Sequence, residues 1–220
     1  MKQRAFIPKR FTYSILRRLH SDSERVLVPS VSMLNELKKY NFKNLVVWNR
    51  GVDTELFNPN KRDTNSKDRQ LTYVGRVAIE KNIEEFLKLK GNYNKTVVGD
   101  GPELQKYINK YPEVNFVGVK TGDELAKYYA NADVFVFPSK TDTLGNVILE
   151  ALASGTPIAA YPVTGPIDVL TDEKINTLDN NLLQSVKKAL KVKRVDCRNF
   201  TLKLTWDKCV NEFLEFMVKV

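Results

Sequence analysis

Short apolar segments and helix-length segments alternate regularly along the middle of the chain, and this alternation constrains the fold more than any other feature. Apolar runs of strand length occur at 71–74, 96–98, 114–117, 133–137 and 157–161. Segments with helical character separate them, at 80–89, 103–109, 122–130 and 145–154. Strands that alternate with helices form parallel sheets through right-handed crossovers. The sequence therefore predicts an α/β domain with a doubly wound parallel sheet.

Fewer elements are predicted outside this region. Short strands are expected at 25–30 and 45–48, with a helix at 32–40 between them. The tail is expected to form helices at 181–190 and 205–218. In the last of these helices, four apolar side chains are predicted to pack against the rest of the protein: Trp206, Phe213, Leu214 and Met217.

Loops that contain glycine follow several of the predicted strands or helices. They are Gly75-Arg76, Gly99-Asp100-Gly101, Gly118, the loop 139–145 and Thr164-Gly165. In open parallel sheets, ligands bind beyond the carboxyl ends of the strands. We therefore expect these loops to line one crevice.

The segment 138–157 is predicted to form the centre of the site. A polar loop carries Asp142, and a helix follows over 145–154. Backbone amides at the N-terminus of such a helix favour an anion. Glu150 is the only charged residue of the helix, and a carboxylate near a core needs a polar partner, which is more often a salt bridge than a ligand. Together these features suit a sugar nucleotide, with phosphate at the helix terminus and hydroxyls against the two acids.

Two cations follow the first strand of the domain. Arg76 and Lys81 lie at the predicted start of a helix, at the same sheet edge as Asp142. A guanidinium binds a diphosphate through two parallel hydrogen bonds, and an ammonium adds a point charge. Surface cations at helix starts are commonly idle, but their convergence with Asp142 favours a function. The sequence contains no Asp-x-Asp, His-Glu-x-x-His or Walker motif, so we expect no metal and no cofactor.

Positive charge is concentrated at the N-terminal end. Residues 1–50 contain 11 Lys and Arg but three acidic residues, whereas the net charge of the whole chain is +9. The segment 9–19 is basic and amphipathic, which fits either a solvated surface helix or peripheral contact of residues 1–20 with an anionic membrane. No helix-turn-helix, zinc-finger or RNA-binding pattern supports nucleic acid as a partner.

The remaining sequence signals concern the compartment. No apolar run is long enough to span a membrane, and no hydrophobic segment of a secretory signal follows the first residues. Cys197 and Cys209 match no metal-binding pattern, which favours free thiols in a reducing compartment. We therefore predict a cytoplasmic protein. The single histidine, His20, is interpreted as a surface residue rather than a general base.

Three motifs, at 75–81, 99–102 and 142–150, resemble those of a known family. They look like the C-terminal, donor-binding half of a GT-B retaining glycosyltransferase of family 4, which implies a Rossmann-like domain that forms one half of the GT-B fold. Asp142 and Glu150, separated by seven residues, carry much of this resemblance.

Further segments extend the resemblance from about Arg25 to Val218. The stretch 49–59 is similar to the interdomain segment of the family. The stretches 141–146 and 165–169 are similar to its α-mannosyltransferase and sulfoquinovosyltransferase-like branch.

The resemblance implies a role for each matched residue. Arg76 and Lys81 would bind the donor diphosphate, and Glu150 would bind the ribose hydroxyls. Asp142, the catalytic residue, would hold the transferred sugar together with the backbone amides of Leu144, Gly145, Asn146 and Val147. The implied reaction moves a hexose, mannose in one branch, from a GDP- or UDP-linked donor to a lipid or glycan acceptor with retention.

The sequence departs from the family in three places. Asp142 stands where Glu is usual, and Asp168 stands where Glu is commoner. The N-terminal domain of the family, which holds the acceptor and a histidine, is largely missing. We therefore predict a remnant of that domain at 1–49, the donor-binding domain at 50–195 and a C-terminal helix at 196–220.

Three alternatives to a complete glycosyltransferase follow from these departures. The first is a truncated, non-catalytic module that binds sugar nucleotides. The second is a half-enzyme that needs a partner chain to supply the missing domain. The third is a sugar-nucleotide epimerase on a similar two-domain architecture.

Overall fold

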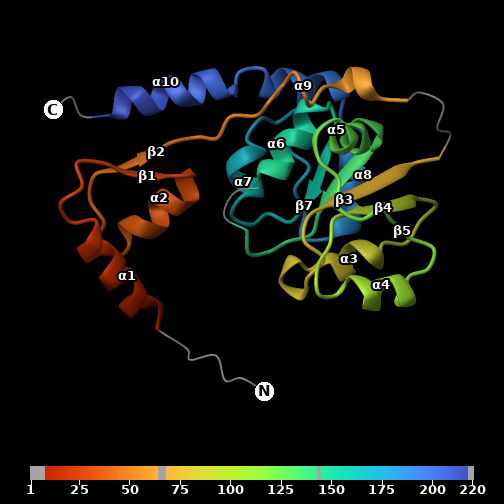
Figure 1. The fold of residues 1–220 in the computed structure, drawn as a ribbon, viewed down its shortest axis with the longest axis horizontal. Coiled ribbons are helices and arrows are strands. Elements are labelled where there is room, and N and C mark those ends of the chain that lie inside the picture. Colours follow the sequence, from red (N-terminus) through yellow and green to blue (C-terminus); the bar gives the residue numbers. More distant parts are fainter. Residues whose placement is uncertain (1–7, 64–67, 143–144, 218–220) are drawn as a thin grey trace.

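The computed structural model describes residues 8–63, 68–142 and 145–217. They form a smaller N-terminal unit and a larger α/β unit (Figure 1). The larger unit contains a five-stranded sheet of order β5-β4-β3-β6-β7, and every pairing in it is parallel. Its strands are β3 (Gln70–Val74), β4 (Asn94–Val98), β5 (Asn115–Phe116), β6 (Val134–Phe137) and β7 (Ile158–Ala160). The predicted doubly wound fold is confirmed.

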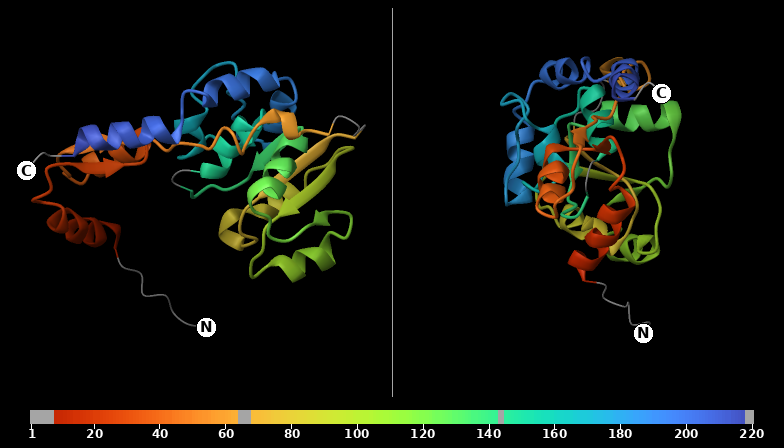
Figure 2. Two further views of the ribbon diagram at one scale, coloured as in Figure 1. Left: turned by 45° about the horizontal axis from the view of Figure 1, so that its top comes forward. Right: turned by 90° about the vertical axis from the view of Figure 1, so that its left-hand side faces the viewer.

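Helices cover both faces of this sheet (Figure 2). One face packs against α3 (Ile83–Leu87), α4 (Leu104–Lys110) and α8 (Leu182–Ala189). The other face packs against α5 (Gly122–Asn131), α6 (Asn146–Ala153) and α9 (Arg194–Thr201). Strand β6 contributes side chains to the cores on both faces of the sheet, because successive strand residues point to opposite faces. Val134 and Val136 belong to the core beneath α3, α4 and α8. Phe135 and Phe137 belong to the core beneath α5, α6 and α9.

The smaller unit contains α1 (Lys9–Leu19), β1 (Val26–Val28), α2 (Val31–Lys38) and β2 (Leu45–Val47). Strands β1 and β2 form a separate two-stranded parallel sheet. Helix α2 begins after Ser30, whose hydroxyl accepts a hydrogen bond from the backbone amide of Met33. Neither α1 nor α2 contains a buried residue. This unit therefore has little core of its own.

The C-terminal helix α10 (Trp206–Phe216) connects the two units, because it leaves the larger unit and lies along β1 and β2 (Figure 1). The indole nitrogen of Trp48 donates to the carbonyl oxygen of Cys209 at 2.9 Å, and the rings of Trp48 and Phe213 are 5.3 Å apart. The predicted packing of the remaining apolar residues is wrong. Trp206, Leu214 and Met217 are 44%, 58% and 57% exposed, because the helix contacts the smaller unit through a narrow face only.

Other elements differ from the sequence-based expectation. The helix predicted at 80–89 is divided, because a 3-10 turn, η2 (Ile79–Lys81), precedes α3 and Asn82 between them has a φ of 54°. Asparagine adopts this left-handed conformation more readily than most residues. Three further elements were not predicted: η1 (Pro59–Lys61), α7 (Pro166–Val169) and α9. Helix α9 extends across the predicted boundary between residues 195 and 196, and the domain division stays a prediction.

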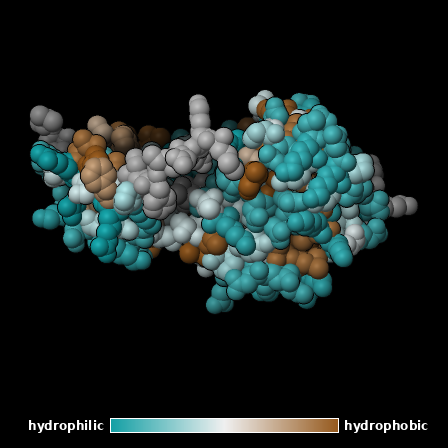
Figure 3. Space-filling model, turned by 90° about the horizontal axis from the view of Figure 1, so that it is seen from below, coloured by the Kyte–Doolittle hydropathy of each residue, from teal (hydrophilic) through white to brown (hydrophobic). Residues whose placement is uncertain are grey.

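The surface of the molecule is mainly hydrophilic on the side seen in Figure 3, and its hydrophobic residues form small separate groups. Helix α1 exposes several apolar side chains, among them Phe11, Ile15 and Leu19. In the part of the chain that the structure describes, no helix is both long enough and apolar enough to cross a membrane.

Candidate functional site

A cavity of about 320 Å³ lies at the carboxyl ends of β3 and β6. These strands are neighbours, but the chain continues from β3 to β4 on one side and from β6 to β7 on the other. Open parallel sheets bind ligands at such a switch point. The lining comes from the end of β3, from Lys81, from the loop after β6 and from the start of α6. It consists of Tyr73, Val74, Gly75, Arg76, Lys81, Phe137, Ser139, Asp142, Gly145, Asn146 and Val147.

Each of the two predicted cations is held by a carboxylate. Lys81 forms an ion pair with Asp142, and Arg76 forms one with Glu80. The Lys81 and Asp142 side chains are 30% and 22% exposed, whereas those of Arg76 and Glu80 are 62% and 50% exposed. Exposed ion pairs contribute at most about 1 kcal/mol of stability. An anionic ligand can therefore replace Glu80 beside Arg76 at little cost.

Two glycines let the loops after β3 and β4 approach each other closely. Gly75 has a φ of 149° and Gly99 a φ of 136°, and residues that carry a side chain rarely adopt such backbone angles. A Cβ atom on Gly99 would stand 2.0 Å from the carbonyl oxygen of Gly75. The cavity lining includes Gly75 but not Gly99, Gly118 or Gly165, so the prediction that all of these loops line one crevice is wrong.

Tyr73 supports the backbone that carries Arg76. Its hydroxyl donates a hydrogen bond to the carbonyl oxygen of Arg76 at 2.8 Å. Burial, reinforced by the negative charges of Asp142 and Glu80, raises the pKa of Tyr73, so the hydroxyl stays protonated at neutral pH. This role of Tyr73 was not predicted, because its position in β3 indicates only a core side chain.

Two hydrogen bonds join the loop of the cations to the loop of Asp142. The side-chain amide of Asn82 donates to the carbonyl oxygen of Pro138 at 3.0 Å, and the hydroxyl of Thr141 donates to the carbonyl oxygen of Glu80 at 3.4 Å. These contacts hold Lys81 next to Asp142. Asn82 was not predicted, although an asparagine that follows a cation at the start of a helix is a signal for a left-handed turn.

The N-terminus of α6 opens into the cavity. Gly145 is its N-cap, and the helix has no side-chain cap there. Backbone amides in the first turn of a helix have no intrahelical partner. Asn146 and Val147, which line the cavity, therefore present the end of the helix where an anion is favoured. Leu144, which was also predicted to contribute its amide, lies outside the described residues.

Glu150 lies one turn further along α6 and is not part of the cavity lining. Its Oε2 accepts a hydrogen bond from the Tyr129 hydroxyl at 2.8 Å. Burial raises the pKa of Glu150, and the hydrogen bond from Tyr129 opposes that effect. Its other oxygen, Oε1, has no hydrogen-bond partner among the described residues. The structure thus brings together all of the described predicted site residues except Glu150.

Two arginines bind the carbonyl groups at the opposite end of α6. Arg194 donates to the carbonyl oxygens of Ala132 at 2.7 Å and of Ser154 at 3.0 Å. Arg198 donates to the carbonyl oxygen of Ala153 at 3.0 Å. Neither arginine was predicted, because the helix that carries them, α9, was not predicted from the sequence. Their role is structural.

The remaining sequence candidates lie away from the cavity. Among residues 8–63, 68–142 and 145–217, no group of three or more His, Cys, Asp or Glu side chains is arranged to hold a metal ion. His20 is exposed at the end of α1. Cys197 and Cys209 are buried free cysteines.

The sequence matches a known family over residues 55–193, described as Glycosyl transferases group 1. A GDP-mannose-dependent alpha-mannosyltransferase of Corynebacterium glutamicum is 35% identical over 173 residues, which cover 74% of this chain and 42% of that protein. The sulfoquinovosyl transferase SQD2 of Arabidopsis thaliana is 35% identical over 180 residues, which cover 74% of this chain and 35% of that protein. The chain thus spans less than half the length of these relatives.

A solved structure has the same fold. Sucrose-phosphate synthase from Thermosynechococcus elongatus superimposes with a TM-score of 0.79 at 22% identity, over 97% of this chain and 63% of that one. Fold and cavity together define an α/β unit of the GT-B type with a ligand site at its switch point. The chain belongs to the Glycosyl transferases group 1 family. Within that family it resembles the mannosyl and sulfoquinovosyl transferases.

Proposed function

We propose that this chain is the donor-binding part of a retaining glycosyltransferase, which moves a hexose from a nucleotide-diphosphate sugar to an acceptor hydroxyl. The proposal rests on one observation: Arg76, Lys81 and the N-terminus of α6 line the same cavity at the switch point. The relative that depends on GDP-mannose makes mannose the first sugar to test.

The two cations and the helix terminus bind the diphosphate in this proposal. A diphosphate between Arg76 and Lys81 takes over the contacts that Glu80 and Asp142 make with these two cations. Charge builds up on the diphosphate as its bond to the anomeric carbon breaks, and the cations and the α6 amides stabilise that charge. No metal takes part.

Asp142 and Glu150 bind the remaining parts of the donor. Release of Lys81 to the diphosphate frees the carboxylate of Asp142, which then accepts hydrogen bonds from hydroxyls of the transferred sugar. The acceptor oxygen bonds to the anomeric carbon on the face that the diphosphate leaves, and the proton of the acceptor hydroxyl passes to the departing diphosphate oxygen. The free Oε1 of Glu150 accepts a hydrogen bond from the ribose, provided that the donor reaches one turn along α6.

Calorimetric titration with GDP-mannose, UDP-glucose and UDP-sulfoquinovose tests the donor site. We expect one donor to bind, and Arg76→Ala and Lys81→Ala to weaken binding by about tenfold or more each, the loss typical of a charge-assisted hydrogen bond. Lys106→Ala is a matched control, because Lys106 forms an exposed ion pair with Glu103 outside the cavity. Unchanged donor binding in both cavity variants would disprove the proposed site.

Transfer is measured separately from binding. Asp142→Asn keeps the size of the side chain but removes its charge, and we expect it to reduce transfer of radiolabelled sugar by about 10²-fold. Donor binding should fall by a much smaller factor. Equal loss of binding and transfer would assign Asp142 to donor binding alone.

We further propose a lipid or glycan acceptor and a peripheral position on the cytoplasmic face of a membrane. Phe11, Ile15 and Leu19 of α1 are 59%, 48% and 72% exposed, and Arg17 and Arg18 end the same helix. Such a helix binds anionic lipid through its apolar side chains, which enter the membrane surface, and through its basic side chains, which attract the lipid charge. Flotation with phosphatidylglycerol vesicles tests this point: we expect binding that Arg17→Glu with Arg18→Glu abolishes, whereas binding unaffected by this double change contradicts it.

A further inference from the structure

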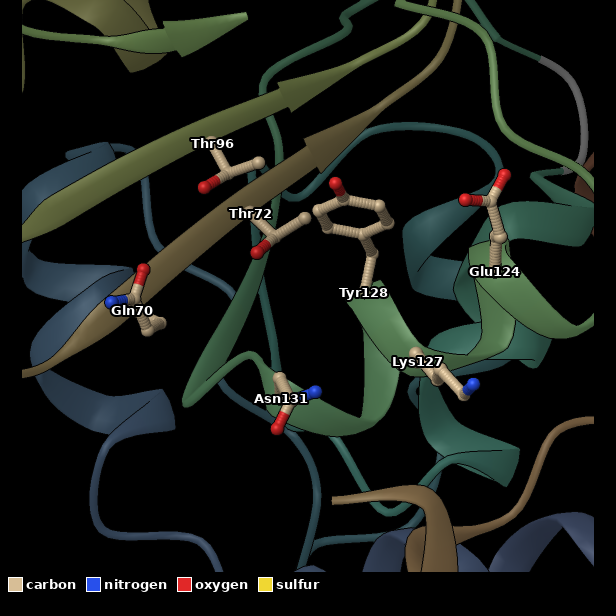
Figure 4. A pocket seen from close by; sticks show the side chains of 7 residues that line it. All are labelled: Gln70, Thr72, Thr96, Glu124, Lys127, Tyr128 and Asn131. Carbon is tan, nitrogen blue, oxygen red and sulfur yellow. The ribbon is translucent and has the colours of Figure 1, made fainter. Parts of the chain in front are cut away.

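A second cavity, of about 380 Å³, lies between the sheet and helix α5 (Figure 4). Its volume falls in the range of about 300–1,000 Å³ that small-molecule sites occupy. No residue lines both this cavity and the donor cavity. Thr72, in this cavity, is three residues from Gly75, which corresponds to about 10 Å along the strand. The two cavities are therefore separate sites on one strand.

Two buried threonines form the floor of this cavity. Thr72 of β3 and Thr96 of β4 are directly opposite each other in the strand pairing, and both line the cavity. They are 3% and 8% exposed, and neither hydroxyl has a hydrogen-bond partner in the described part of the chain. Central strands of a parallel sheet are normally apolar on both faces. Among the described residues, the buried side-chain oxygen without a partner is that of Ser154, so the two threonine hydroxyls open into the cavity, where a polar ligand can reach them.

Helix α5 forms the wall of the cavity. Its lining residues, Glu124, Lys127, Tyr128 and Asn131, recur at intervals of three or four and so share one face of the helix. Figure 4 shows the Tyr128 ring rising from α5 beside the threonines. The apolar residues Ala126, Tyr129 and Ala130 of the same helix are buried in the core. Asn131 also accepts a hydrogen bond from the backbone amide of Asp63 at 2.7 Å, whereas the other three residues of this polar face border the cavity without joining the core.

The charge of the lining favours a neutral ligand. Lys127 pairs with Asp123 at 3.1 Å, and Glu124 pairs with Lys120 at 3.4 Å, so the two charged residues of the rim have partners of opposite sign. The floor contains only uncharged groups. The preference for a neutral ligand rests on this floor, which offers a phosphate or a metal ion no charge of opposite sign, and not on the ion pairs of the rim, which are exposed and weak. Threonine hydroxyls both donate and accept hydrogen bonds, and tyrosine offers an apolar ring beside a polar group.

We infer that this cavity binds a neutral saccharide. The hydroxyls of Thr72 and Thr96 and the side-chain amide of Gln70, at the start of β3, hydrogen-bond the sugar hydroxyls. The apolar face of the sugar ring packs against Tyr128. Neither interaction requires a nucleotide, so this site does not depend on the donor site. A free sugar and one residue of a glycan chain present the same chemistry to it.

The inference is tested by amide chemical-shift titration of the whole chain with methyl α-mannoside, methyl α-glucoside and a linear mannotriose. We expect at least one of them to cause saturable shifts at Thr72, Thr96 and Tyr128. Tighter binding of the mannotriose than of either monosaccharide identifies a glycan chain as the source, and equal binding identifies a single sugar. Absence of saturable shifts with all three sugars overturns the inference.

The double variant Thr72→Val with Thr96→Val removes both hydroxyls but keeps the branched shape of the side chains. We expect saccharide binding to weaken about tenfold, as for two lost neutral hydrogen bonds, while GDP binding at the donor cavity is unchanged. Thr54→Val, outside both cavities, is the matched control. Tyr128→Leu supplies an independent variant of the wall. Undiminished saccharide binding in both the double variant and Tyr128→Leu also overturns the inference.

Discussion

The two ends of helix α6 differ in how their unpaired backbone groups are satisfied. At the C-terminal end, guanidinium groups of Arg194 and Arg198 bind the carbonyl oxygens of Ser154 and Ala153. At the N-terminal end, Gly145 provides no side chain and the first turn faces a cavity. Both arrangements match the helix dipole, which favours cations at the C-terminus and anions at the N-terminus. One end is closed by arginine side chains of the protein, and the other opens into the cavity.

The largest effect is expected at the closed end. Arg194→Met removes the guanidinium that donates to the carbonyl groups of Ala130, Ala132 and Ser154. Arg62 still donates to the carbonyl groups of Ala130 and Ala132, so Ser154 is the one of the three that loses its side-chain donor altogether. Burial lowers the pKa of Arg194 to about 10, so the guanidinium is still charged at neutral pH. We expect the free energy of unfolding to fall by about 3–5 kcal/mol, because several hydrogen bonds from a charged donor are lost together.

Urea denaturation measures this loss. Lys193→Met, a change at the exposed residue next to Arg194, is the control and should alter stability by no more than about 0.5 kcal/mol. If Arg194→Met unfolds at the same urea concentration as the control, the two ends of α6 do not differ as described.

The open end should gain stability from a ligand. GDP at one hundred times its dissociation constant raises the free energy of unfolding by about 2.7 kcal/mol if it binds only the folded chain. We expect this increase, followed as a shift of the thermal unfolding midpoint, in the wild type. The double variant Arg76→Ala with Lys81→Ala should lose most of the shift, and a full shift in that variant would show that GDP binds elsewhere.

The smallest effect is expected inside the helix, at Glu150. Burial raises the pKa of this carboxyl above its ordinary value of 4.5, which means that the folded state binds the proton more tightly than the unfolded state. Ionisation therefore destabilises the fold, and wild-type stability declines as the pH rises from about 4.5 through the raised pKa. Glu150→Gln lacks this decline. Comparing the two proteins by urea denaturation at pH 4 and pH 7 should show the variant gaining relative to the wild type at the higher pH, and an equal difference at both values contradicts the assignment.

Much of the cavity could be predicted because its parts are local. Arg76, Lys81, Asp142 and Gly145 each lie just after a strand or at the start of a helix, and parallel strands bring such positions to one edge of the sheet. The orientation of Glu150 could not be predicted in this way. Its carboxylate meets Tyr129 of α5, a contact that depends on how two helices pack on the sheet.

The sequence by itself determined the alternation of strands and helices, the doubly wound topology and the family, because these depend on periodicity, turn residues and motif spacing. Only the tertiary structure decided which carboxylate holds each cation, that α9 closes the end of α6, and that two threonines share a cavity with α5. Those features join residues that are distant in the chain, and the contacts between them exist only once the sheet and its helices have packed.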